Sequence, residues 1–242
     1  MSIPNQCIII GGGASIKEGI TLSLKEKIQD KFVLGINFAF HFFQPTCTLF
    51  LDNKVWSGHL MGNSNTYCDS EHIKKIRQEP LIITSTMAKI KPIPDNVIVL
   101  KKADKYTREQ SKICGFYVGH LTGVFAIGVA SYLMNYSGEI FLLGFDWTKS
   151  NAGEQIPTTH FYSSKEIRHK GMGMTNYYNK HDSKKVFEMF LQNHPKIYNV
   201  SPNSNIDYFE KIDYNKMFSL LTPEQANQIE LRQLIKQKLK SV

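Results

Sequence analysis

The sequence predicts an α/β domain with a doubly wound, mostly parallel sheet and a lid inserted in its second half. Short apolar runs rich in β-branched residues recur along the 242-residue chain, and such runs are typical of strands buried on both faces. The apolar segment 121–136 is long enough for a buried helix, and it leads directly into the strand-like run 139–145. Strands that alternate with helices in this way form parallel, doubly wound sheets.

The first strand-like run is followed by a glycine-rich turn. Residues 7–10, CIII, suit a buried strand, and Gly11, Gly12 and Gly13 come next. Glycine allows positive φ angles and lets another backbone segment or a phosphate approach closely. Two interpretations stay open: a phosphate-binding loop, or a strand-to-helix turn without a ligand.

A helix is predicted over 16–30, directly after this turn. Ser15 precedes Glu18 by three residues, which is the pattern of a capping box. The backbone N–H groups at the start of this helix are expected to be free to bind an anion, above all a phosphate. Ile16 stands where a dinucleotide-binding loop would have its third glycine, so the pattern favours a nucleotide or phosphate ligand other than NAD.

Polar residues follow the next two predicted strands at the points where they end. Asn37 follows the strand 32–35, and Asp52 ends the strand-like run 46–52. The carboxyl ends of parallel strands meet at one edge of the sheet, where such sheets bind ligands. We therefore expect a shared cleft in which Asn37 reads a base or a sugar hydroxyl, with a simple turn residue as the alternative.

Further strands are expected within 80–85 and 95–101, before the buried helix 121–136. Thr122 and Gly123 are acceptable residues at the start of that helix, whose N-terminal dipole would face the cleft. The strand after this helix leads into a polar rim made of Gly144, Phe145 and Asp146.

The segment 148–180 differs from the rest of the chain because it is polar and rich in His, Lys, Arg and Tyr. We interpret it as a basic, aromatic lid over the cleft. The predicted organisation is a nucleotide-binding α/β domain over 1–147 and 181–222, the lid over 148–180, and a C-terminal helix over 223–242.

Composition restricts the function further. The net charge of +8 indicates an acidic partner, but no nucleic-acid-binding module is recognisable. The four cysteines have no metal-ligand spacing, no signal peptide pattern precedes the first strand, and no apolar run reaches about 18 residues. We therefore expect a cytoplasmic protein with reduced thiols, for which peripheral contact with an anionic membrane and homo-oligomers remain open.

The remaining pieces are a nucleotide cleft, a basic lid and eight histidines. There is no zinc spacing, no nucleophile elbow and no P-loop lysine motif. These pieces fit the transfer of a group away from a nucleotide. Arg, Lys and Tyr would stabilise the leaving phosphate, and a histidine would take the proton of the acceptor.

Four segments carry a resemblance to the bacterial sialyltransferases that use CMP-sialic acid and modify lipooligosaccharide. IIIGGGASIKE looks like the family's I-x-G-N-G-P-S-L-K-E, and LGINFAF looks like its C-N-Q-F segment. TGVFAIGVASYLMNYSGEIFLLGFDW resembles SGV…A…GYKEIYLxGIDFY. NYYNKHDSKKVFEMFLQNHPKIYNVSPNSNIDYF resembles HYIGHSKNTDIKALEFL…IKLYCLCPNSxLxxF. Related motility-accessory and phage proteins have the same Rossmann-like domain.

The resemblance implies a glycosyltransferase-A-like variant of the Rossmann-like fold and an inverting transfer of a sialic or other nonulosonic acid to a glycan hydroxyl. It makes His181 the general base and Tyr162 a contact of the leaving phosphate. We expect basic residues of the lid, such as Arg168, to contact this phosphate as well. A CMP-type nucleotide sugar is the favoured donor, no metal ligand is identified, and Mg²⁺ is not implied. The donor-binding residues that it and the strand ends imply are Gly11, Gly12, Gly13, Ala14, Ser15, Asn37, Asp52, Thr122, Gly123, Gly144, Phe145, Asp146, Ser201, Pro202 and Asn203.

Two further hypotheses stay open. Relatives in the wider group resemble a pterin pyrophosphokinase, which would use ATP and Mg²⁺ and would need carboxylates such as Asp52 and Asp146 near the phosphates. The other is a non-catalytic nucleotide-binding accessory protein of phage type. Its support is that Gly12 and Ala14 stand where the sialyltransferases have asparagine and proline.

Overall fold

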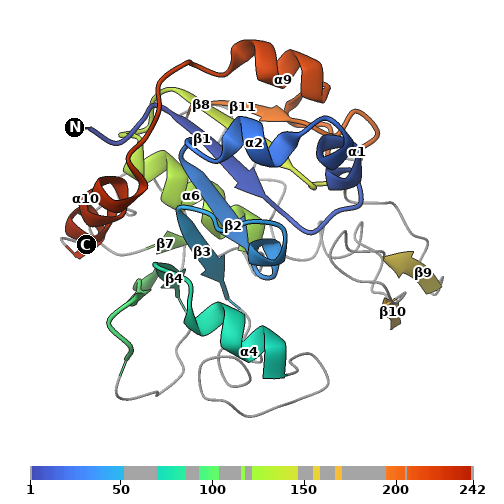
Figure 1. The fold of residues 1–242 in the computed structure, drawn as a ribbon. Coiled ribbons are helices and arrows are strands. Elements are labelled where there is room, and N and C mark those ends of the chain that lie inside the picture. Colours follow the sequence, from blue (N-terminus) through green and yellow to red (C-terminus); the bar gives the residue numbers. More distant parts are fainter. Residues whose placement is uncertain are drawn as a thin grey trace.

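A computed structural model describes residues 2–51, 70–85, 93–103, 116–117, 122–146, 155–158, 167–170, 195–204 and 206–240. Its centre is one eight-stranded sheet in which every described pairing is parallel, in the order β12-β11-β8-β1-β2-β3-β4-β5 (Figure 1). Helices flank the sheet on both faces. The predicted Rossmann-like α/β fold class is therefore confirmed.

The strands of this sheet form where the sequence is apolar and β-branched. Those near its centre are buried over almost their whole length. The strands are β1 (Gln6–Ile10), β2 (Val33–Ile36), β3 (Cys47–Phe50), β4 (Ile82–Thr84), β5 (Val97–Val99), β8 (Glu139–Leu143), β11 (Lys196–Asn199) and β12 (Glu210–Lys211).

Two smaller strand pairs lie outside the main sheet. β6 (Lys102–Ala103) pairs with β7 (Phe116–Tyr117), and β9 (Gln155–Thr158) pairs antiparallel with β10 (Ile167–Lys170). β6 falls in the segment 101–111, whose polar and charged composition predicts a surface loop or lid. β9 and β10 fall within the predicted lid, and their placement over a cleft stays a prediction.

The sheet lies between two helical layers (Figure 1). The side chains of its central strands alternate between these layers. On one face, Ile9 and Leu142 pack with α6 (Thr122–Leu133) and α10 (Gln228–Lys240). On the other face, Ile8 and Phe141 pack with α1 (Ile16–Thr21), α2 (Leu24–Ile28) and α9 (Tyr214–Leu220). Near the β4–β5 edge, α4 (Ser70–Arg77) packs through Ile76.

The predicted helix over 16–30 is wrong as a single element, because the chain forms α1 and α2 with a break between them. Ser23 adopts a left-handed conformation with φ of +59°, which no helix can continue through. Gly19 lies against the ring of Tyr214, and a Cβ there would be 2.5 Å from Tyr214 Cε1. Short α1 therefore docks closely on α9, and the break lets α2 follow the sheet.

Two other helices begin or end differently from the prediction. The buried helix expected over 121–136 ends at Leu133, because Asn135 and Tyr136 have positive φ. The C-terminal helix begins at Gln228 rather than near Pro223. Four further elements were not predicted, namely α4, α9, β12 and the short 3-10 helix η1 (Ala39–His41).

Cys7 and Cys47 are buried free thiols, in agreement with the expectation for these two residues. Burial raises the pKa of both thiols above their usual range, so both stay protonated. In the described ranges, no helix is both long and apolar enough to cross a membrane.

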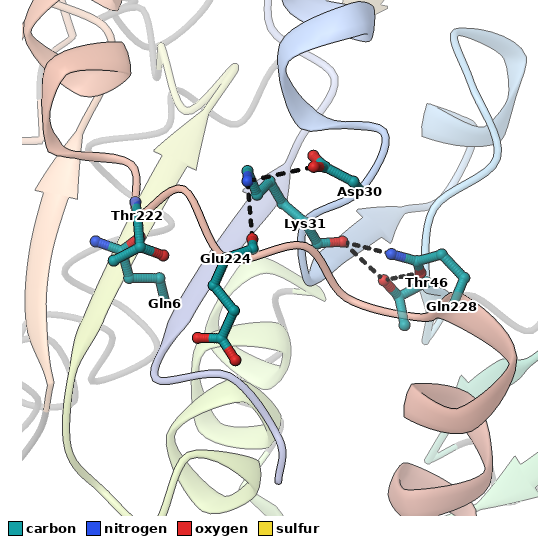
Figure 2. Close-up of polar contacts among 7 residues, drawn as sticks. All are labelled: Gln6, Asp30, Lys31, Thr46, Thr222, Glu224 and Gln228. Atoms are coloured by element: carbon teal, nitrogen blue, oxygen red, sulfur yellow. Dashed lines mark hydrogen bonds and ion pairs between the residues drawn. The ribbon is translucent and has the colours of Figure 1, made fainter. Parts of the chain in front are cut away.

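Residues 221–227, the C-terminal arm, cross the amino ends of the central strands and connect the two helical layers (Figure 2). Thr222 N–H donates to Gln6 Oε1 at the start of β1 (2.8 Å). Lys31 Nζ, just before β2, donates to the Glu224 carbonyl oxygen (2.8 Å). Gln228 follows the arm, and its Nε2 donates to the Lys31 carbonyl oxygen (2.9 Å). The arm thus covers the edge opposite the carboxyl ends of the strands.

Replacing Thr46 with valine is expected to destabilise this edge. Thr46 is buried, accepts a hydrogen bond from Val33 N–H (3.0 Å) and donates to Gln228 Oε1 (2.8 Å). Valine has the same shape but leaves both partners unpaired, at a cost of about 1–3 kcal/mol. Urea denaturation of both proteins measures the loss. The matched control is Thr21→Val, since Thr21 is exposed, and a loss as large in the control would contradict the explanation.

Candidate functional site

The candidate site lies where β1 and β8 meet at the carboxyl edge of the sheet. From β1 the chain proceeds outward through β2, β3, β4 and β5, and α6 then returns it to β8 on the other side of β1. The loops after β1 and β8 therefore leave the sheet in opposite directions. Such a reversal of strand order is where open α/β sheets bind ligands.

The glycine turn after β1 is shaped by the end of β8. Gly11 N–H donates to the Leu143 carbonyl oxygen (2.7 Å), and Gly13 N–H donates to the Gly144 carbonyl oxygen (3.0 Å). A Cβ on Gly11 would lie 2.8 Å from the Gly144 oxygen, and one on Gly13 would lie 2.6 Å from Asp146 Cγ. Both glycines are thus required by the close approach of the chain's own segment 143–146.

The predicted capping box is wrong, because Ser15 makes no side-chain cap hydrogen bond. Its hydroxyl donates instead to Asp146 Oδ1 and lies 2.8 Å from Ser201 Oγ. Its backbone N–H donates to Asp146 Oδ2 (2.9 Å), and Ser201 Oγ donates to Asp146 Oδ1 (2.9 Å). One carboxylate therefore joins the loops after β1, β8 and β11.

The predicted row of free N–H groups at the start of α1 is also wrong. The N–H groups of Gly11, Gly13 and Ser15 all donate hydrogen bonds to acceptors within the protein. Asp146 supplies negative charge beside the first turn of the helix, where it is electrostatically favourable. While Asp146 holds this position, the Ser15 N–H does not receive a ligand phosphate.

Tyr214 supports the same corner from α9, and its hydroxyl donates to the Ser15 carbonyl oxygen (3.3 Å). Burial, followed by the nearby carboxylates of Asp146 and Glu18, raises the pKa of Tyr214 above its usual range. The phenol is therefore neutral and keeps the proton that it donates.

The conformation of the β8 loop is held by two side chains that bind the Phe145 carbonyl oxygen. Asn199 Nδ2 donates to it at 3.3 Å and Ser204 Oγ at 2.6 Å. Gly144 has a φ of +70°, which turns the chain so that Asp146 reaches Ser15. Asn199 and Tyr214 are the residues of this region that sequence reasoning missed, since neither belongs to a recognisable motif.

The start of α6 lies at the same corner. Thr122 and Gly123 are half-buried, and a Cβ on Gly123 would be 2.8 Å from Cε1 of the Phe145 ring. The structure thus brings together most of the predicted donor-binding residues from four separate segments. The residues that it gathers here are Gly11, Gly12, Gly13, Ala14, Ser15, Thr122, Gly123, Gly144, Phe145, Asp146 and Ser201.

Asn37 lies along the same edge, directly after β2, which is the strand next to β1. Its φ is +52°, and its N–H donates to the Leu49 carbonyl oxygen (2.8 Å). Its side-chain oxygen Oδ1 is buried and has no hydrogen-bond partner. An unpaired buried acceptor at this edge is available to a ligand donor, so both predicted roles, turn residue and ligand contact, remain compatible with its geometry.

The other predicted residues are placed less completely. Pro202 and Asn203 are exposed in the loop after β11. Arg168 lies on β10, opposite Pro157 of β9. His181, Tyr162 and Asp52 lie outside the described residues. Within the described part of the chain, no group of three or more His, Cys, Asp or Glu side chains is placed to hold a metal ion.

No protein-family model, curated protein or solved structure matches this chain. The resemblance to the sialyltransferases therefore stays a prediction, supported by the short motifs themselves.

Proposed function

We propose that the protein is a glycosyltransferase that takes a sugar, such as sialic acid, from a CMP-type nucleotide donor and transfers it to a glycan hydroxyl. The supporting observation is that the Ser15–Asp146–Ser201 hydrogen bonds join three loops at the reversal of strand order. Each of these loops belongs to a segment that separately resembles the donor-binding part of the sialyltransferases. Their meeting at the edge where such sheets bind ligands favours one shared donor site.

The geometry favours a particular orientation of the donor. Because Asp146 already accepts the Ser15 N–H, the start of α1 repels rather than attracts a second anion. The nucleoside part would lie against the sheet edge, where Asn37 has an unpaired acceptor. The phosphate would point away from the sheet, towards Tyr162 and Arg168 of the predicted lid.

The proposed reaction is a single displacement. His181 takes the proton of the acceptor hydroxyl, and the acceptor oxygen forms a bond to the anomeric carbon on the face opposite the nucleotide. The bond between that carbon and the phosphate oxygen breaks, and its electron pair leaves with CMP. One base and stabilisation of the leaving phosphate are sufficient for this chemistry, and the anomeric configuration is inverted.

Replacing His181 with alanine is expected to lower the transfer rate by about 100-fold or more, because a positioned general base contributes at least that factor. The affinity for CMP is expected to change little, since the base contacts the acceptor. The assay follows CMP release from CMP-sialic acid with a panel of oligosaccharide acceptors. His72→Ala on α4 is the matched control, and its rate is expected to equal that of the unsubstituted protein.

A thermal-shift panel of CMP, CDP, UDP, GDP, ATP and CMP-sialic acid tests the donor class before any acceptor is known. We expect CMP and CMP-sialic acid to raise the melting temperature most, because a ligand that binds only the folded state stabilises it. Stabilisation by none of them would overturn the proposal. Stabilisation by ATP alone, and only with Mg²⁺, would replace it with the pyrophosphokinase-like alternative.

A further inference from the structure

Ser85, directly after β4, has a polar atom that the fold leaves unused. The residue is 5 % exposed, and its hydroxyl oxygen is buried and has no hydrogen-bond partner. Leaving a buried hydroxyl unpaired costs about 1–3 kcal/mol, so such groups in a folded protein call for an explanation. Ser85 is not part of any motif in the sequence.

The strand register places Ser85 along the same edge as Asn37. Asn37 follows β2 and donates its N–H to Leu49 of β3, and Leu49 pairs with Ile83 of β4. Ser85 comes two residues after Ile83 and follows the last residue of its strand. The two residues are therefore separated by two strand spacings, or about 10 Å. A base joined to a ribose can bridge such a span.

Other unpaired polar atoms do not suit a ligand. Ser131 lies inside α6 and Asn199 on β11, and both are 0 % exposed. Asn199 also uses its amide nitrogen to hold Phe145. Ser85 and Asn37 keep some exposed surface at the carboxyl edge. In contrast, the oxygens of Asp146 on the other side of β1 already accept hydrogen bonds.

We propose that Ser85 is a ligand-binding residue and that the nucleoside part of the donor lies across the carboxyl ends of β2, β3 and β4, between Asn37 and Ser85. This inference rests on the proposed function and adds to it the contact partners of the nucleoside. The Asn37 oxygen accepts from a hydroxyl or amino group of the nucleoside, and the Ser85 hydroxyl donates to or accepts from another.

The test is a titration of the full chain and of Ser85→Ala with cytidine, with CMP and with inorganic phosphate. Loss of one neutral hydrogen bond is expected to lower the affinities for cytidine and for CMP by the same factor, about 3-fold to 10-fold. The melting temperature of Ser85→Ala without ligand is expected to equal or exceed that of the unsubstituted protein, because the substitution removes an unpaired hydroxyl.

Two variants complete the design. In Asn37→Gly, glycine adopts the positive φ of this position without strain, and the side-chain oxygen is removed. This variant is therefore also expected to bind cytidine and CMP more weakly. Ser219→Ala on the exposed face of α9 is the matched serine control and is expected to leave both affinities unchanged.

Each other outcome is decisive. Unchanged affinities in Ser85→Ala would overturn the inference, and so would weaker binding of CMP alone, which would indicate a phosphate contact. A large drop in the melting temperature of ligand-free Ser85→Ala would show that the hydroxyl has a structural role. If the unsubstituted protein responds to neither cytidine nor CMP, the proposed function fails together with this inference.

Discussion

Replacing Gly13 with alanine is expected to lower the free energy of unfolding by about 3 kcal/mol or more and to abolish nucleotide binding. An ideal Cβ at Gly13 would lie 2.6 Å from Asp146 Oδ2 and 2.6 Å from the Gly144 carbonyl oxygen. The second of these atoms is backbone and cannot rotate away. The methyl group must therefore push apart the loops after β1 and β8.

Separation of these loops breaks several interactions at once. The Gly13 N–H loses the Gly144 oxygen, and Ser15 loses Asp146. Overpacking costs about 1–3 kcal/mol, and each buried polar group left unpaired costs a similar amount. For a domain of this size, 3 kcal/mol corresponds to a melting temperature lower by about 6–12 °C. Differential scanning calorimetry measures this shift.

Gly128→Ala is the matched control for Gly13→Ala. Gly128 lies inside α6, and an added Cβ there would meet nothing within 4 Å. Alanine is the better helix former by about 1 kcal/mol, so this variant is expected to be at least as stable as the unsubstituted protein. If Gly13→Ala has the same melting temperature as the unsubstituted protein, the loops after β1 and β8 do not approach each other this closely.

Replacing Glu79 with glutamine is expected to stabilise the protein by about 3 kcal/mol at pH 8 and to have little effect at pH 4.5. Glu79 is buried and accepts a hydrogen bond from Thr48 Oγ1 (2.5 Å). Burial raises its pKa to about 7, against smaller lowering effects of the Thr48 hydrogen bond and of Arg232. Glutamine keeps an acceptor for Thr48 and has no charge to bury.

The direction of the pH dependence follows from the raised pKa. Between the ordinary value of 4.5 and about 7, the folded protein holds a proton on Glu79 that the unfolded chain has lost. The stabilising contribution of this proton is complete below the unfolded pKa and is lost as the pH rises through the folded pKa. A shift of this size corresponds to about 3 kcal/mol.

Urea denaturation of both proteins at pH 4.5 and pH 8 measures this effect. The quantity of interest is the difference between Glu79→Gln and the unsubstituted protein, since other groups titrate equally in both. Glu224→Gln is the matched control, because Glu224 is exposed and only its backbone oxygen makes the contact drawn in Figure 2. A difference that stays constant between the two pH values would show that folding does not raise the pKa of Glu79.

Much of the candidate site could be predicted because polar residues at strand ends share one edge in any parallel sheet. Asn37 and Asp146 were predicted in this way, and Ser15 was predicted from the glycine turn and its helix start; the structure places all three at that edge. Asn199 and Tyr214 could not be predicted, since nothing in their local sequence separates a structural hydrogen bond from ordinary burial. Ser85 lacks any motif, and only its unpaired hydroxyl singles it out.

By itself, the sequence determined the class of fold, since the apolar runs, the buried helix predicted over 121–136 and the glycine turn each depend on local patterns. Only the tertiary structure decided what the glycine turn contacts. The capping pattern of Ser15 and Glu18 describes a local hydrogen bond, but Asp146, 131 residues away, offers Ser15 a charged acceptor instead. The order of strands creates that contact, and a pairing between distant segments leaves no periodic signal in the chain.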